Sequence, residues 1–252
     1  QPPVFMVSLL YLEGIGSNQC ILAARIEAET AMVCKGVLAN FTIYAEKTQT
    51  ETHIHMLSYA RASELSAPSS SFHWATSSCV TSAGEIAIVI VAGANLLVVG
   101  KDLWRALSAL IHAKVLVCQL EVSPNTSRQA QLLAQVMKTN FNPAPAIPDL
   151  HSDFYRASDV FCCNESEWMS VGLDRSLGSR DCVVLSAQEP SSLSIRVPTK
   201  PVTTVDTMGD GDSLICAMAF YMAHFPTMQL EDGQQTGRKH LIPQKDLPTE
   251  IF

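Results

Sequence analysis

From about residue 84 onward, hydrophobic and polar positions follow two alternating patterns. Short apolar runs, typical of buried strands, are separated by longer segments in which apolar residues recur at helical spacing. Strands are predicted at residues 86–92, 114–119, 139–142, 159–163 and 182–186. Helices are predicted at residues 102–112, 127–138 and 214–223. This alternation indicates an α/β fold in which parallel strands are covered by helices on both faces.

Four polar residues, Glu121, Asn142, Asn164 and Asp206, lie at or just after the ends of predicted strands. Ligands of parallel sheets bind beyond the carboxyl ends of the strands. We therefore expect these side chains to share one site.

The composition is that of a folded chain with one substantial core. It has 252 residues, of which 47% are hydrophobic and 16% charged, so we expect a single domain over residues 1–252. Residues 37–73 differ, being polar at 42–55 and rich in Ser and Pro at 67–71, and are predicted to form a linker or irregular excursion. The net charge of −7 argues against a nucleic-acid groove or an anionic membrane surface as partner.

Eight cysteines lie mostly inside apolar runs, without a C-x-x-C pair. Buried free thiols explain this pattern better than a disulfide framework or a zinc site. His53 and His55 could share one face of a strand, and a solvated strand face is favoured there over a metal site.

The segment Val205-Asp206-Thr207-Met208-Gly209-Asp210-Gly211-Asp212-Ser213 leads into the apolar helix predicted at 214–223. Backbone N–H groups at a helix start attract anions, and glycines let the chain approach a phosphate without a Cβ in the way. The alternative is a turn with a helix cap, since Asp, Ser and Gly favour both.

This segment resembles the C-terminal signature of the ribokinase (PfkB) family, Asp-Thr-x-Gly-x-Gly-Asp followed by a helix of small residues. Further motifs resemble animal members of the family in the same order, at residues 14–25, 88–95, 117–121, 142–146, 159–167 and 245–248. The likeness covers residues 14–36 and 74–225 and the last few residues. It implies a ribokinase-like, three-layer, doubly wound, mostly parallel sheet.

The resemblance implies ATP-dependent transfer of the γ-phosphate to the primary hydroxyl of D-ribose. Asp212 would be the base, and the amides of Asp210, Gly211 and Asp212 would form the anion hole. The sugar would be held by Glu121 and by the motif Gly14, Ile15, Gly16, Ser17 and Asn18. From the residues alone, Asn18 could instead cap a helix over residues 19–28, and Glu121 could be a solvated loop carboxylate.

Nucleotide and cation roles follow from the same resemblance. Nucleotide-binding positions would be Asn164, Ser176, Leu177, Gly178, Ser179, Arg180, Asp181, Thr199 and Gly211. Glu167 would reach Mg²⁺ through water, and Asp206 with the carbonyl of Met208 would bind an activating K⁺. A homodimer and a cytoplasmic location, with a nuclear one allowed, are also implied.

Several departures from the family pattern motivate a second hypothesis, a relative that binds a sugar or a partner without turnover. No first strand carrying a sugar-binding Asp precedes Gly14, and Ile15 replaces a Lys. The lid region across 37–73 is degraded, a helix and a strand are missing between Gly172 and Ser176, and the stretch after Glu231 diverges. Asp210 adds a negative charge beside the phosphate site. A Rossmann oxidoreductase would rest only on residues 14–16 and is not favoured, because Gln19 stands where that motif needs glycine.

Overall fold

The computed structural model describes the secondary structure over the following ranges: 7–10, 14–26, 28–34, 54–58, 75–80, 86–91, 93–134, 136–164, 167, 181–184, 195–198 and 209–227.

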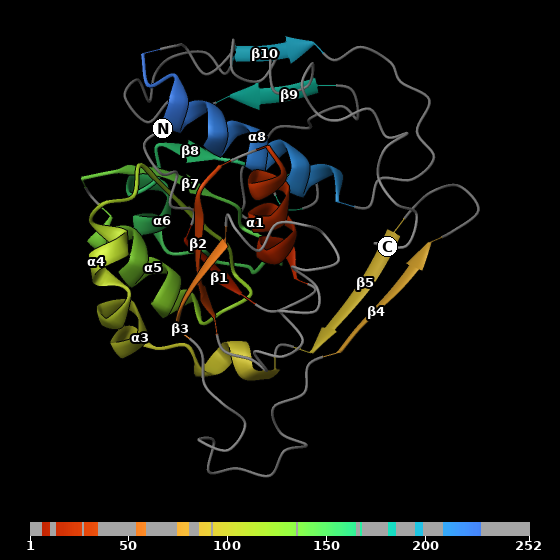
Figure 1. Ribbon diagram of the computed structural model, residues 1–252. Helices are drawn as coiled ribbons and strands as arrows, with labels where there is room; N and C mark the ends of the chain where they lie inside the picture. The colour runs from red at the N-terminus through yellow and green to blue at the C-terminus, as the bar shows by residue number, and fades with distance from the viewer. Residues whose placement is uncertain are drawn as a thin grey trace.

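Two three-stranded parallel sheets lie side by side at the centre of the structure (Figure 1). The first contains, in order, β1 (Val7–Leu10), β2 (Thr30–Cys34) and β3 (Ile54–Ser58); the second contains β6 (Val115–Cys118), β7 (Lys138–Phe141) and β8 (Val160–Phe161). Because β1 is in contact with β6, the strands succeed one another as β3-β2-β1-β6-β7-β8. The strand order therefore reverses between β1 and β6, where ligands of doubly wound sheets bind.

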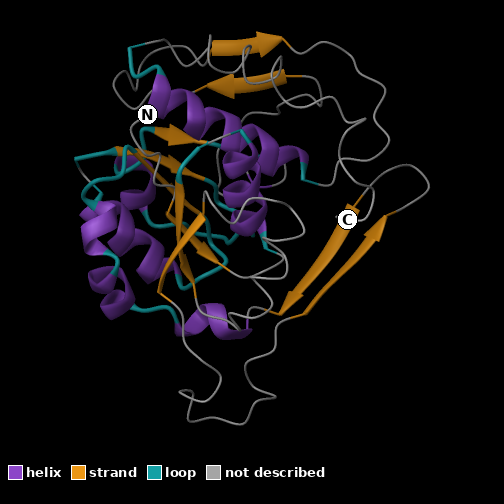
Figure 2. Cartoon of the chain, in the orientation of Figure 1, coloured by secondary structure: helices purple, strands orange, loops and turns teal. Residues whose placement is uncertain are grey.

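Helices cover both faces of this sheet (Figure 2). On one face α1 (Ile15–Arg25) packs against α8 (Asp210–His224). The helices on the other face are α3 (Gly100–Arg105), α4 (Leu107–Leu110), α5 (Pro124–Leu133) and α6 (Ser152–Arg156). The short 3₁₀ helix η3 (Gly93–Leu97) precedes α3 in the chain. The alternating side chains of β6 join two separate cores: Val115 and Val117 pack with α1 and α8, whereas Leu116 and Cys118 pack with residues of α3 to α6. This confirms the three-layer α/β prediction.

Two predicted members of the parallel sheet are wrong. The run at 86–92 forms β5 (Ile86–Val91), which pairs antiparallel with β4 (Ala75–Val80). The run at 182–186 forms β9 (Asp181–Val184), which pairs antiparallel with β10 (Ile195–Pro198). The connections, residues 81–85 and 185–194, are shorter than the dozen or so residues that a parallel crossover needs.

Three further predictions need correction. A strand, β1, does precede Gly14, although its four residues contain no Asp. The irregular excursion predicted across 37–73 contains β3, which pairs parallel with β2. The helix predicted at 102–112 is two short helices separated at Ala106, which lies in a turn.

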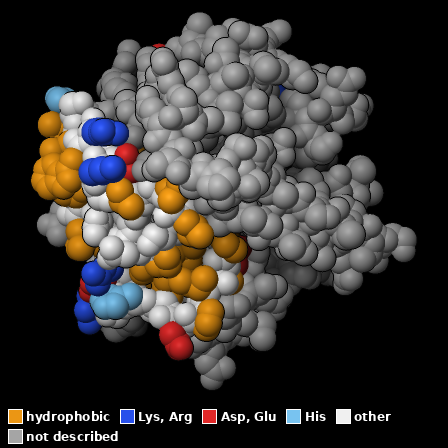
Figure 3. All heavy atoms as spheres, turned by 90° about the horizontal axis from the view of Figure 1, so that it is seen from below, with side chains coloured by type: hydrophobic (Ala, Val, Ile, Leu, Met, Phe, Trp, Pro, Cys, Tyr) orange, Lys and Arg blue, Asp and Glu red, His pale blue; other side chains and the backbone are white. Residues whose placement is uncertain are grey.

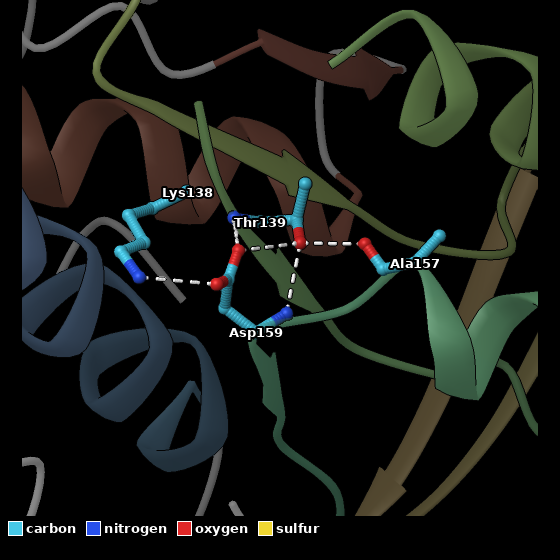
Figure 4. A network of polar contacts seen from close by, with 4 residues as sticks. All are labelled: Lys138, Thr139, Ala157 and Asp159. Carbon is cyan, nitrogen blue, oxygen red and sulfur yellow. Dashed lines mark hydrogen bonds and ion pairs between the residues drawn. The ribbon is translucent and has the colours of Figure 1, made fainter. Parts of the chain in front are cut away.

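The start of β8 is fixed to β7 by a network around Asp159 (Figure 4). The Asp159 carboxylate accepts from the backbone N–H of Thr139 at 2.8 Å and pairs with Lys138 Nζ at 3.1 Å. The Thr139 hydroxyl donates to the Ala157 carbonyl at 2.7 Å and accepts from the Asp159 N–H at 2.9 Å. These bonds set the register of β8, whose other end leads to the candidate site.

On the surface, hydrophobic side chains gather on the described part of one face (Figure 3). Large apolar side chains exposed in the described part of the chain include Leu96 and Leu97 in η3 and Trp104 in α3. Within the described ranges, no helix has the length and apolar character needed to cross a membrane.

Candidate active site

Glu121 lies just beyond the carboxyl end of β6 and contacts the start of α1, the helix that follows β1. Its Oε1 accepts from the backbone N–H of Ile15 at 3.1 Å, and its Oε2 accepts from that of Gly16 at 3.5 Å. The side chain is therefore held against the start of α1 and is only 7% exposed, which rules out a solvated loop carboxylate. Burial raises the pKa of Glu121 to about 7; the two backbone donors oppose this rise, and the charge of Asp212 adds to it.

The start of α1 lies further toward the N-terminus than predicted. Gly14 is the N-cap residue with an extended backbone, and the helix begins at Ile15. Asn18 is thus inside the helix, where its N–H bonds to the carbonyl of Gly14 at 3.2 Å. The alternative in which Asn18 caps a helix over residues 19–28 is wrong, because its side chain is directed at α8 instead.

The start of α8 has the geometry expected of an anion site. Gly209, the N-cap, has a left-handed backbone with φ of 73°, which glycine adopts without strain. The N–H and hydroxyl of Ser213 bond back to the Gly209 carbonyl at 3.0 and 2.9 Å. The first turn of a helix leaves its N–H groups without partners inside the helix. A Cβ placed on exposed Gly211 would meet no atom within 4 Å, so there is open space beside these amides.

Asp212 lies in this first turn and is directed toward α1. Its Oδ2 accepts from Asn18 Nδ2 at 2.9 Å, and its Oδ1 accepts from Gln19 Nε2 at 3.0 Å. Burial raises the pKa of Asp212 to about 6; the two amide donors lower it, and the charge of Glu167 raises it. A carboxylate so engaged with another helix is not a cap for its own, which disfavours the simple turn-and-cap alternative.

Besides Glu121, two more of the four predicted strand-end residues, Asn142 and Asn164, form hydrogen bonds near the ends of their strands. Asn142, after β7, donates through Nδ2 to the carbonyl of Cys162 at 2.9 Å and to Glu167 Oε2 at 3.5 Å. Asn164 donates to Glu167 through its backbone N–H at 2.9 Å and through Nδ2 at 3.0 Å, and Glu167 N–H returns a bond to Asn164 Oδ1 at 2.8 Å. Burial raises the pKa of Glu167, with these donors opposing the rise.

Glu167 is a reasonable residue for a divalent cation that is held mainly by phosphates and water. Mg²⁺ uses few protein carboxylates and keeps several waters, and a nearby cation would offset the burial cost of this carboxylate. In the described ranges no three His, Cys, Asp or Glu side chains come together as a metal cluster. His53 lies outside those ranges, and only the backbone of His55 is described, within β3.

Several predicted site residues lie outside the described ranges: Ser176, Leu177, Gly178, Ser179, Arg180, Thr199, Asp206 and Met208. Asp181 is described only as the first residue of β9, and Asp210 only as the first residue of α8.

Two residues of the site were not singled out from the sequence. Gln19 and Gln119 are both 0% exposed, and Gln119 Nε2 donates to Gln19 Oε1. Together with the bond from Gln19 to Asp212 they form a continuous line of amides. The sequence signal for them is their position: Gln119 is the last residue of the strand predicted at 114–119, and Gln19 is the first residue of the helix considered over residues 19–28.

The described cysteines fit the prediction of buried thiols better than a catalytic role. The five whose side chains are described, Cys20, Cys118, Cys162, Cys163 and Cys216, form no disulfide. Burial raises the pKa of Cys20 and of Cys118 to about 12, which disfavours a thiolate nucleophile.

The sequence is similar to that of known sugar kinases. Mouse ribokinase is 37% identical over 279 residues, covering 95% of this chain and 84% of the mouse protein. A deoxyribokinase of Salmonella typhi is 26% identical over 230 residues, covering 82% of this chain and 73% of that protein. A scan against protein-family models gives no match.

The fold is also similar to solved ribokinase structures. That of Giardia lamblia ribokinase matches with a TM-score of 0.70 at 20% identity, covering 89% of this chain and 81% of the other. That of Arabidopsis thaliana ribokinase complexed with ribose and ATP matches with a TM-score of 0.66 at 17% identity, covering 90% and 79%.

The three-layer fold with this strand order and the similarity to known ribokinases together define a phosphotransferase of the carbohydrate kinase class. The chain belongs to the ribokinase family, as 37% sequence identity to mouse ribokinase over 95% of this chain shows.

Proposed function

We propose that this chain transfers the γ-phosphate of ATP to the primary hydroxyl of D-ribose, giving ribose 5-phosphate and ADP. The observation that carries the proposal is the contact between Asp212 and Asn18, which joins the glycine turn before α8 to the sugar motif that opens α1. The mouse relative named ribokinase and the Arabidopsis structure holding ribose and ATP support the choice of substrates.

Asp212 would act as the base that accepts the proton of the sugar hydroxyl. As that proton moves to the carboxylate, the hydroxyl oxygen bonds to the γ-phosphorus and the bond to the β-phosphate oxygen breaks, so that ADP leaves. A pKa of about 6 leaves about nine in ten of the carboxylates ionised at pH 7 while making the group a stronger base than an exposed aspartate.

The N–H groups of Asp210, Gly211 and Asp212 would face the transferring phosphate. Phosphoryl transfer has a loose transition state with charge spread over the phosphate oxygens, so positioning and charge stabilisation supply most of the catalysis. The open space beside Gly211 supports an approach of phosphate to these amides.

Glu121 and Asn18 would hold sugar hydroxyls, with Gly14, Ile15, Gly16 and Ser17 forming the wall behind them. Glu121 is already fixed by the amides of Ile15 and Gly16, so it can accept from a sugar hydroxyl without reorganising. Glu167 would bind a Mg²⁺ ion through water, and such an ion would neutralise charge on the nucleotide phosphates. K⁺ binding by Asp206 and Met208, and nucleotide contacts by Asn164, Thr199 and residues 176–181, remain part of this proposal.

The second hypothesis, binding without turnover, is less well supported. One of its reasons was the missing first strand with its sugar-binding Asp: the strand is present as β1, and the Asp is absent from it. The Asp210 carboxylate remains a reason, and Asp210→Ala is expected to raise ATP affinity if that charge faces the phosphate. The homodimer and the cytoplasmic location are proposals too, which sedimentation velocity and imaging of the tagged chain would test.

The decisive experiment measures ADP release with D-ribose for the wild-type chain and for Asp212→Asn. We expect the variant to lose kcat by about a hundredfold to ten-thousandfold, the usual contribution of a general base. Asp153→Asn, which changes an aspartate in the first turn of α6, is the matched control and should retain activity. A folded wild-type chain no faster than Asp212→Asn would refute the proposal.

A further inference from the structure

We propose that Gln119 and Gln19 form an amide relay that orients Asp212 for proton transfer. This inference rests on the proposed function, in which Asp212 is the base. Neither glutamine needs to touch the sugar or the nucleotide; both act through the Asp212 carboxylate and are positioning residues.

The relay runs between three elements that meet at the site. Gln119 follows β6, Gln19 lies in α1, and Asp212 lies in the first turn of α8. The main chain of Gln119 is held by α5, because the hydroxyl of Ser127 donates to its carbonyl at 2.7 Å. Its Nε2 donates to Gln19 Oε1, and Gln19 Nε2 donates to Asp212 Oδ1 at 3.0 Å.

The direction of the relay follows from the chemistry of a primary amide. A side-chain amide has a carbonyl oxygen that only accepts and an NH₂ group that only donates. Because Gln119 donates to the Gln19 carbonyl, the NH₂ group of Gln19 must face Asp212. Gln19 therefore presents a donor to Oδ1, while Asn18 presents one to Oδ2 at 2.9 Å. Two donors on fixed elements set the plane of the carboxylate.

All three side chains of the relay are buried, so the loss of one hydrogen bond is not made good by solvent. Gln19 and Gln119 are 0% exposed and Asp212 is 9% exposed, so water cannot readily replace a lost amide. Other groups influence Asp212 from the elements around it: Glu121 beyond β6 and Glu167 beyond β8 carry like charge, and the thiol of Cys216 lies in α8. The relay supplies the counteracting donor on the side of Oδ1.

The test compares Gln19→Met and Gln119→Leu, which remove amides while keeping approximate volume, with Gln131→Met. Gln131 is an equally buried glutamine in α5 whose Nε2 donates to Ser158 at 3.0 Å, outside the site. We expect Gln19→Met to lower kcat by about tenfold to a hundredfold, the cost of a bond to a charged group, with KM for ATP within about twofold. Gln119→Leu should lower kcat less, Gln131→Met should not lower it, and the double variant should be no worse than Gln19→Met alone.

A second measurement does not depend on turnover. Carbon-13 NMR of aspartate-labelled protein, with the Asp212 signal assigned by its loss in Asp212→Asn, gives the titration midpoint of Asp212. The midpoint should rise in both relay variants and stay in place in Gln131→Met. If the wild type does not phosphorylate ribose, the proposed function fails, and this titration still decides whether the relay exists.

Gln119→Glu tests the direction of the relay and leaves Gln19 in place should Gln19→Met not fold. An ionised carboxylate at this position accepts instead of donating, so Gln19 would turn its amide over and direct its carbonyl at Asp212, and the added negative charge would act on Asp212 in the same direction. The Asp212 midpoint should then rise further than in Gln119→Leu. Equal midpoints in wild type and Gln119→Leu, a reversed order of the two Gln119 variants, or additive losses of kcat would overturn the proposal.

Discussion

Gly14 and the Glu121 carboxylate approach each other so closely that position 14 has no room for a side chain. A Cβ built on Gly14 would lie 2.6 Å from both Glu121 oxygens and 2.9 Å from its Cδ. The glycine is thus required by this approach, since its backbone φ of −92° is open to any residue. It lets the first N–H groups of α1 hold the carboxylate beyond β6.

Gly14→Ala is expected to push Glu121 away from the amides of Ile15 and Gly16. The sugar site would be distorted while the start of α8 is untouched, so KM for ribose should rise by about tenfold, as for one lost bond to a charged group, with KM for ATP unchanged. Steady-state kinetics with each substrate varied in turn measures both constants.

The matched control for that change is Gly100→Ala. A Cβ there would lie 2.7 Å from Gln129 Oε1, the end of a half-buried side chain that can move aside. Kinetics should be those of the wild type. A rise in KM for ribose equal in the two variants would contradict the role given to Glu121.

The turn from Gly209 to Asp212 could be predicted because its glycines and aspartates are contiguous and precede a long apolar helix. The strand-end positions of Glu121, Asn142 and Asn164 could be predicted because parallel strands place their carboxyl ends at one edge. These local and periodic signals recovered the β6–β8 half of the sheet.

Other features depend on tertiary pairing that periodicity does not report. Strand β1 has only four residues, and β3 contains His55 and Ser58, so each is recognisable mainly through its pairing with β2. Gln19 and Gln119 were missed for a related reason. A glutamine is usually exposed, and its burial here follows from the meeting of α1, β6 and α8.

The contribution of Asp212 and Glu121 to the stability of the protein should fall as the pH rises from about 4 to about 7. The pKa values of Asp212 and Glu121 rise on folding from 3.8 and 4.5 to about 6 and about 7, so the native state holds protons that the unfolded chain has released. Stabilisation by these two groups is complete below their unfolded pKa values and is lost as pH passes their folded values. The change is on the order of a few kcal/mol.

Urea unfolding of wild type and Glu121→Gln at several pH values between 4.5 and 7.5 measures this effect. The variant lacks one titrating carboxyl, so its free energy of unfolding should fall less steeply across the range. Parallel curves for the two proteins would mean that Glu121 titrates alike in the folded and unfolded states.

Glu167→Gln is expected to weaken the use of Mg²⁺ and ATP. The amide keeps the shape of the side chain and removes the charge that would orient water on the cation. The Mg²⁺ concentration for half-maximal rate should rise several-fold, while KM for ribose stays the same. Titrating MgCl₂ at fixed ATP measures the shift, and a variant that alters only KM for ribose would exclude Glu167 from the cation site.

Thr139→Val should destabilise the fold without altering substrate affinity. The Thr139 side chain is buried, and its hydroxyl joins the Ala157 carbonyl to the N–H of Asp159 at the start of β8 (Figure 4). Valine has similar volume but cannot donate to the Ala157 carbonyl, whereas the Asp159 N–H keeps its bond to the backbone carbonyl of residue 139 at 3.1 Å. Loss of the bond to the Ala157 carbonyl should cost about 1–3 kcal/mol in the free energy of unfolding. The control is Lys138→Met, which removes an ion pair whose partners are 46% and 35% exposed and should cost under about 1 kcal/mol. Urea unfolding that shows an equal loss in the two variants would mean that the exposed ion pair stabilises the start of β8 as much as the buried hydroxyl does, contrary to this prediction.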